Sequence, residues 1–256
     1  MIPLHDSIPR VHKPYMIYAI IIACSLVFLF EKTLPQHQLS DFFYLYGVVP
    51  ARFTNPTWAA RINFPPDAWY VFITHLFIHG GWLHIIFNMW FLWIFGDNIE
   101  DVMGPTRFGL FYLTCGVAAI SVNILFNPTS TTPVVGASGA IAGVMGAYFL
   151  LYPHAKVLTL IPVFIIPFFF YLPAIFFLLL WVGIQLVFGL AALGGHATDS
   201  VAWWAHAGGF LSGIILLPLF RKKDRCYYCK VPEGTPPVKP TLLVPNSPRS
   251  SHPDKE

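Results

Sequence analysis

The chain has 256 residues, of which 56% are hydrophobic and only 11% are charged. A soluble domain normally carries about 25% charged residues, so the composition excludes an ordinary soluble protein and favours one embedded in a lipid bilayer. The formal net charge of +3 is too small to indicate a nucleic-acid partner. Four cysteines give no disulfide framework: Cys24 and Cys115 lie in apolar runs, and Cys226 and Cys229 form one Cys-x-x-Cys motif without a second pair.

The first half of the chain contains three expected membrane spans. A short N-terminus at residues 1–14 precedes the first span, residues 15–30. Residues 31–70 form a long loop rich in proline and aromatic residues, a composition that suits the membrane interface. The second span covers residues 71–96 and the third covers residues 108–126.

Three further spans are expected in the second half, at residues 138–152, 173–190 and 201–220. Prolines at positions 162, 167 and 173 break the apolar stretch before the fifth span. We therefore expect residues 157–172 to be an irregular hydrophobic connection. Beyond residue 220, proline, serine and charged residues predict a disordered tail over 221–256. The predicted fold is an all-α polytopic membrane protein with a six-helix membrane domain over residues 15–220.

The distribution of lysine and arginine predicts the orientation of this domain. With six spans, only Lys32, Arg52 and Arg61 fall on one side, spread over the long first loop. The opposite side carries the larger basic set, which consists of Arg10, Lys13, Arg107, Lys156, Arg221, Lys222, Lys223 and Arg225. Both termini are therefore expected to be cytoplasmic. Six spans without an added domain favour a prokaryotic plasma membrane.

Ser138 and His206 stand at the same inferred depth. About fourteen residues separate each of them from the far end of its span, at Tyr152 and Phe220. At roughly 1.5 Å per helical residue that distance is about 21 Å, within a hydrocarbon core of roughly 30 Å. A serine and a neutral histidine at one level inside a membrane can form a nucleophile and a general base.

Small residues predict that these two spans touch, through Gly139 and Gly143 on one and Gly209 and Gly213 on the other. Ser138 could also serve as a helix N-cap, an interpretation that is compatible with catalysis. Asp199 is a possible third member of a triad. Because it precedes His206 by seven residues, we expect it to lie in the loop, and we predict a dyad.

The second span carries a stripe of polar residues, His75, His79, His84 and Asn88. Residues 84 and 88 share one helix face, and His75 and His79 are expected to continue it. A metal site at His79 and His84 fits the five-residue spacing poorly, so we expect no metal and no cofactor. Hydrogen bonding between helices is the alternative for His75 and His79. His84 and Asn88 suit donors that stabilise an oxyanion beside the serine.

Together these motifs resemble the rhomboid intramembrane serine proteases. They are His75-x3-His79-x4-His84-x3-Asn88, Gly136-Ala137-Ser138-Gly139, and Ala205-His206-x2-Gly209-x3-Gly213, and the resemblance covers about residues 70–220. It implies that Ser138 is the nucleophile and His206 the general base. It also implies an oxyanion hole formed by His84, Asn88 and the Ser138 amide.

The resemblance further implies that the fifth helix is part of a lateral substrate gate, with Phe177 and Trp181 facing Phe87. Many family members carry Trp-Arg shortly before the second span, whereas here Trp69 is followed by Tyr70.

The expected function is cleavage of transmembrane protein substrates near the outer end of their membrane segment. His75, His79 and Gln185 are expected to line the route by which water reaches the acyl-enzyme. The alternative is a membrane transporter or a chaperone that binds client helices. The lack of charged residues in the middle of any expected span argues against transport.

Overall fold

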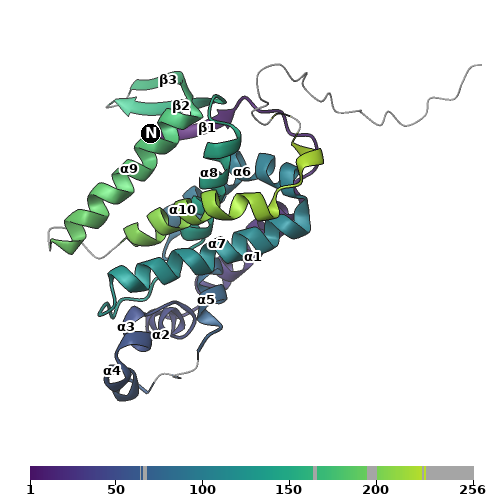
Figure 1. The fold of residues 1–256 in the computed structure, drawn as a ribbon. Helices are drawn as coiled ribbons and strands as arrows, with labels where there is room; N and C mark the ends of the chain where they lie inside the picture. Colours follow the sequence, from purple (N-terminus) through teal and green to yellow (C-terminus); the bar gives the residue numbers. More distant parts are fainter. Residues whose placement is uncertain (64, 66–67, 164–165, 195–200, 227, 229–256) are drawn as a thin grey trace, which may run out of the picture.

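Most of the apolar segments form helices of one bundle in the computed structural model of this chain (Figure 1). The structure describes residues 1–63, 65, 68–163, 166–194, 201–226 and 228. The helices of the bundle are α1 (Tyr15–Glu31), α5 (Val71–Thr74), η1 (His75–Phe77), α6 (Trp82–Met103), α7 (Pro105–Phe126), α8 (Ser138–Leu151), α9 (Ala174–Leu193) and α10 (Trp203–Phe220). The expected bundle of apolar helices is confirmed.

Within the described residues, helices α7, α9 and α10 are each long and apolar enough to cross a membrane. The α5–η1 segment and α6 pass the same test only as a pair. Helices α1 and α8 are shorter and apolar, with 17 and 14 residues. Each expected span thus has a helical counterpart, and the total of six crossings stays a prediction.

The second expected span is not one straight helix, and this part of the prediction is wrong. The chain bends by 96° between η1 and α6. Gly80 and Gly81 lie in this break, and glycine is among the weakest helix formers. The bend means that His75 and His79 do not continue the face of α6 that carries His84 and Asn88.

The connection at residues 157–172, expected to be irregular, is a β-hairpin. Strands β2 (Lys156–Val163) and β3 (Ile166–Pro173) pair antiparallel, and β1 (Ile2–Asp6) pairs antiparallel with β2 to give the order β1-β2-β3. β-branched residues make up half of β2, and aromatic residues make up half of β3, a composition that favours sheet structure. Pro162 lies beyond the part of β2 that pairs with β1, and Pro167 lies on an edge strand, so neither interrupts the pairing.

Three short helices occupy the expected interfacial loop: α2 (Gln36–Tyr46), α3 (Pro50–Thr54) and α4 (Pro56–Arg61). They lie at the end of the molecule opposite the sheet (Figure 1). Arg52 is buried and its Nη2 donates to the carbonyl oxygen of Tyr44 at 2.9 Å. Tyr70, at the position after Trp69, donates its hydroxyl to the Leu45 carbonyl at 3.2 Å. These contacts anchor the loop without a Trp-Arg motif.

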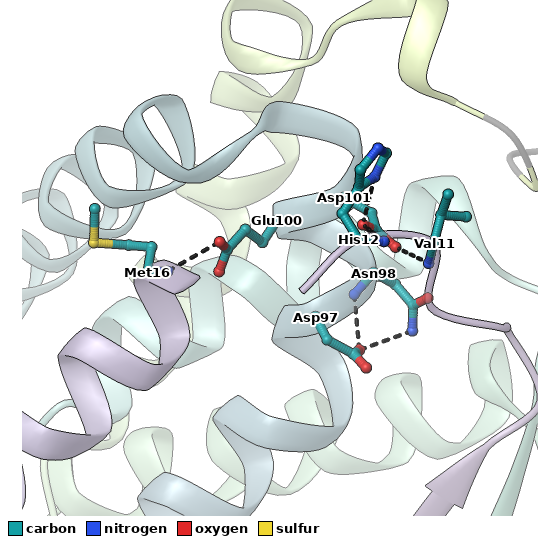
Figure 2. Close-up of polar contacts among 7 residues, drawn as sticks. All are labelled: Val11, His12, Met16, Asp97, Asn98, Glu100 and Asp101. Carbon is teal, nitrogen blue, oxygen red and sulfur yellow. Dashed lines mark hydrogen bonds and ion pairs between the residues drawn. The ribbon is translucent and has the colours of Figure 1, made fainter. Parts of the chain in front are cut away.

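The C-terminal end of α6 holds the start of the chain in place (Figure 2). The sequence prediction ended this span at Gly96, but α6 continues to Met103. The Glu100 carboxylate accepts the backbone N–H groups of Met16 and Ile17 at 2.9 and 3.0 Å. Because the first amides of a helix have no intrahelical acceptor, Glu100 caps α1.

Two further carboxylates fix the residues before α1. Asp101 accepts the backbone N–H of Val11 at 2.6 Å (Figure 2). Asp6, at the end of β1, accepts from Asn98 Nδ2 at 2.9 Å and from the hydroxyl of Tyr148 on α8. The N-terminal strand is therefore joined to both α6 and α8. The last short helix, η2 (Lys223–Arg225), lies at the start of the tail expected to be disordered, and residues 227 and 229–256 of that tail lie outside the described residues.

Candidate active site

Helices α8 and α10 meet backbone to backbone. A Cβ atom added at Gly209 would overlap the carbonyl oxygen of Gly139, and one at Gly213 would overlap the carbonyl oxygen of Gly143. Gly139 and Gly143 in turn face Ala119 and Cys115 of α7. The four glycines expected at a helix contact thus lie at a close three-helix junction around α8, where a side chain would separate the helices.

This contact brings Ser138 and His206 together. Ser138 is the first residue of α8, and His206 lies in the first turn of α10. The distance from Ser138 Oγ to His206 Nε2 is 2.8 Å, a hydrogen-bond distance. Just before the serine, Gly136 has a φ of +123°, which disfavours any residue with a side chain, and its N–H donates to the His75 carbonyl at 2.8 Å.

Gly136 also leaves room for the two polar residues of α6. A Cβ at this position would lie 2.7 Å from His84 Nε2 and 3.7 Å from Asn88 Nδ2. Asn88 is only 7% exposed, and its Nδ2 is a buried donor without a hydrogen-bond partner among the described residues. The N–H of Gly80 points at His84 Nδ1 at 3.4 Å. The neutral His84 ring then carries its proton on Nε2 and can act as a donor there.

A cavity of about 1130 Å³ opens onto these groups. It lies between the N-terminal parts of α6 and α8, helix α9 and the start of α10. Its lining includes both members of the predicted dyad and both predicted oxyanion donors, with Phe87 and Trp181 among the apolar side chains.

Two of the three predicted gate residues line the cavity, and the third is packed in the core. Trp181 lines the cavity, as Phe87 does, and its ring lies 5.8 Å from the ring of His206. Phe177 does not sit opposite Phe87: its ring lies 6.5 Å from Phe91 and 5.9 Å from Phe95, one and two turns further along α6. Because Phe177 is 1% exposed, it forms part of the core between α9 and α6 below the cavity.

The residues predicted to line a water route are all buried, and the cavity lining contains none of them in the described part of the chain. His75 Nδ1 donates to the Val71 carbonyl at 2.8 Å. The backbone N–H of His79 donates to the Glu31 carboxylate at 3.1 Å, and its ring lies 5.2 Å from that of His84. His79 therefore helps to fix the bend before α6, whereas the His75 side chain hydrogen-bonds within the preceding α5–η1 segment.

Gln185 has a role that sequence reasoning missed. Its Oε1 lies 2.8 Å from Nδ1 of His206, on the side of the ring away from Ser138. A signal existed, because Gln185 is the single polar side chain of α9. Asp199, the alternative third member of a triad, lies outside the described residues. Among those residues no group of three or more His, Cys, Asp or Glu side chains could hold a metal ion.

Comparisons with known proteins agree on one family. Residues 66–223, more than half of the chain, match the model of the Rhomboid domain. The chain is 33% identical over 167 residues to Rhomboid-like protein 11, chloroplastic, of Arabidopsis thaliana. The matched stretch covers 62% of this chain and 55% of that protein. It is 28% identical over 149 residues to Rhomboid protein 1, mitochondrial, of Saccharomyces cerevisiae. The matched stretch covers 54% of this chain and 38% of that protein.

A third relative is Rhomboid protease GluP of Bacillus subtilis, 39% identical over 84 residues, covering 33% of this chain and 16% of that protein. The chain thus spans about half or less of the length of these relatives. The family match contains the bend, the glycine contact and all residues around the cavity that come from helices α6 to α10. This chain is an integral, multi-pass membrane protein that belongs to the rhomboid family.

Proposed function

We propose that this chain is a serine endopeptidase that cleaves membrane proteins in or near their transmembrane segments. The observation that carries the proposal is the 2.8 Å contact between Ser138 Oγ and His206 Nε2 at the wall of a large cavity. A serine hydroxyl becomes an effective nucleophile when an adjacent base can take its proton. Family membership supports a protease, since relatives named as proteases occur in it.

In the proposed reaction, His206 takes the proton as Ser138 Oγ attacks the carbonyl carbon of the substrate. The carbonyl oxygen becomes an oxyanion, and the free Nδ2 of Asn88, the Nε2–H of His84 and the Ser138 N–H are its donors. His206 then returns the proton to the leaving amine. Water hydrolyses the acyl-enzyme, with His206 again acting as base.

The proposed substrate is the transmembrane helix of another protein, which reaches Ser138 laterally past Trp181 and Phe87. With both termini in the cytoplasm, as the basic residues predict, Ser138 lies nearer the outer face and cleavage occurs near the outer end of the substrate helix. The relatives named above include chloroplastic, mitochondrial and bacterial proteins. A prokaryotic plasma membrane is therefore a proposal that rests on composition and span number alone.

Labelling with a fluorophosphonate probe, which reacts with activated serines, tests the proposal. We expect purified protein in detergent to be labelled, and Ser138→Ala and His206→Ala each to abolish labelling. Ser212→Ala is the matched control: Ser212 also lies on a bundle helix, but its hydroxyl donates to the Gly208 carbonyl. A transporter or client-binding chaperone would give no labelling, and labelling retained in Ser138→Ala would contradict the assignment of the nucleophile.

A further inference from the structure

Gln185 lies between two hydrogen-bonding groups that each fix its orientation. It is 6% exposed and sits on α9, facing α10. Its Nε2 donates to the backbone carbonyl of Trp181, one turn earlier, at 3.0 Å. Its Oε1 lies 2.8 Å from His206 Nδ1.

These two contacts determine which nitrogen of His206 carries the proton. The Trp181 carbonyl can only accept, so the NH₂ end of the Gln185 amide must face it. The amide oxygen then faces His206, and since this oxygen can only accept, Nδ1 must donate. In a neutral imidazole the other nitrogen is unprotonated. His206 Nε2 therefore presents its lone pair to Ser138 Oγ, as a general base requires.

We propose that Gln185 is a positioning residue that holds His206 in the Nδ1-protonated tautomer, so that Ser138, His206 and Gln185 form one hydrogen-bonded chain across α8, α10 and α9. The proposal rests on the function proposed above. An amide cannot take up a proton at neutral pH, so Gln185 orients the imidazole and selects its tautomer without adding charge. In serine hydrolases of the triad type a carboxylate performs this orienting role.

The other neighbours of the His206 ring cannot replace this contact. The rings of Trp181 and Trp203 lie 5.8 and 6.4 Å from it and restrict the position of its plane. Ring contacts of this kind do not distinguish the two nitrogens. Without the Gln185 oxygen, the buried Nδ1–H loses its acceptor, which favours moving the proton to Nε2.

The test compares Gln185→Met with Gln185→Glu. Methionine has the same unbranched length but no oxygen, whereas glutamate retains an acceptor at the same place. We expect Gln185→Met to lower kcat and the rate of fluorophosphonate labelling roughly 10- to 100-fold with little change in KM. Gln185→Glu should recover most of the loss. Val187→Met, on the exposed face of the same helix, should behave as wild type.

Nitrogen NMR of ¹⁵N-histidine-labelled protein provides a readout independent of activity, with His206 assigned by the signal lost in His206→Ala. We expect Nδ1–H in the wild type and an increased Nε2–H population in Gln185→Met. An unchanged tautomer in Gln185→Met, or a raised KM with unchanged kcat, would overturn the proposal. If the wild type were not labelled at Ser138, the protease assignment would fail, while the tautomer measurement would still decide the role of Gln185.

Discussion

Asn88 carries an unusual feature at the residue scale, a buried amide donor without an acceptor. The side chain is only 7% exposed, and its Nδ2 has no hydrogen-bond partner among the described residues. Leaving such a donor unpaired costs about 1–3 kcal/mol. This cost is consistent with a group that finds its acceptor only when a substrate oxygen enters the cavity. Preorganised donors of this kind stabilise charge as it develops and need no rearrangement.

We therefore expect Asn88→Ala to lower kcat by roughly 10- to 1000-fold, the range around the loss of one oxyanion donor. KM should change little, because the interaction strengthens only in the transition state. Steady-state kinetics on a transmembrane peptide, with a thermal melt of the same protein, measures both quantities.

Asn98→Ala is the matched control on the same helix. Asn98 hydrogen-bonds Asp6 at the far end of α6, so its loss should lower thermal stability and leave kcat of the folded protein unchanged. If Asn88→Ala instead melted early with normal kcat, Asn88 would serve only to hold helices together.

The residues around Ser138 could be named from the sequence because three separated motifs carry them. Motifs do not give contacts, however. As the single polar side chain of α9, Gln185 could be recognised as a candidate, but its partner depends on how α9 tilts and rotates against α10, which the sequence of α9 alone does not give. A straight second helix would place His75 and His79 beside the site, as the predicted water route requires. The 96° bend between η1 and α6 removes them from that face.

At the scale of elements, the junction of α8 and α10 is made by main-chain atoms. Gly139 and Gly209 allow the two helices to touch without intervening side chains, and the Ser138–His206 distance depends on this separation. A displacement of about 1 Å at a reacting group can cost on the order of 100-fold in rate.

Gly209→Val should therefore abolish labelling and proteolysis almost completely, although it adds no charge and replaces no catalytic group. Gly183→Val, on α9, is the control, because a Cβ at Gly183 meets nothing within 4 Å. Fluorophosphonate labelling, with size-exclusion chromatography to check that both variants stay folded, separates the two. Full labelling of Gly209→Val would show that the helices can move apart without affecting Ser138 and His206.

The apolar helices of the bundle could be predicted from hydropathy, but the bend before α6 and the β-hairpin could not. Gly80 and Gly81 signal a weak point in an apolar run, yet the bend also needs the Glu31 carboxylate at the His79 N–H. The hairpin at 156–173 was hidden because its prolines exclude a helix without specifying a partner. Strand β2, the central strand of the sheet, also pairs with residues 2–6, about 150 positions away. Pairing over such a separation leaves no local signal in the sequence.

At the scale of the whole molecule, the sheet joins residues 2–6 to α9, the proposed gate helix. β1 is held to α6 and α8 through Asp6, and β3 runs directly into α9. Burial raises the pKa of the Asp6 carboxyl to about 6, although the hydrogen bond from Tyr148 opposes this shift. The folded state thus retains the Asp6 proton to higher pH than the unfolded chain, whose ordinary pKa is 3.8.

The pKa of Asp6 predicts how stability depends on pH. Because the folded state binds the proton more tightly, the contribution of Asp6 is fully present below about pH 4 and is lost as pH rises through about 6. One pKa unit corresponds to about 1.4 kcal/mol, so the total loss is roughly 3 kcal/mol. Unfolding of wild type and Asp6→Asn in detergent between pH 4 and 7 measures it. A stability difference between the two that stays constant with pH would contradict this account.

The pairing of Ile2 with Leu160 also sets an order of events during biosynthesis. Ribosomes add roughly 5 to 20 residues per second, so roughly 8 to 30 s pass between the synthesis of β1 and that of its partner strand. Throughout this interval α1, α6, α7 and α8 are made while residues 2–6 have no strand to pair with. Residues 2–6 are therefore made well before β2 and are among the last to reach their final place.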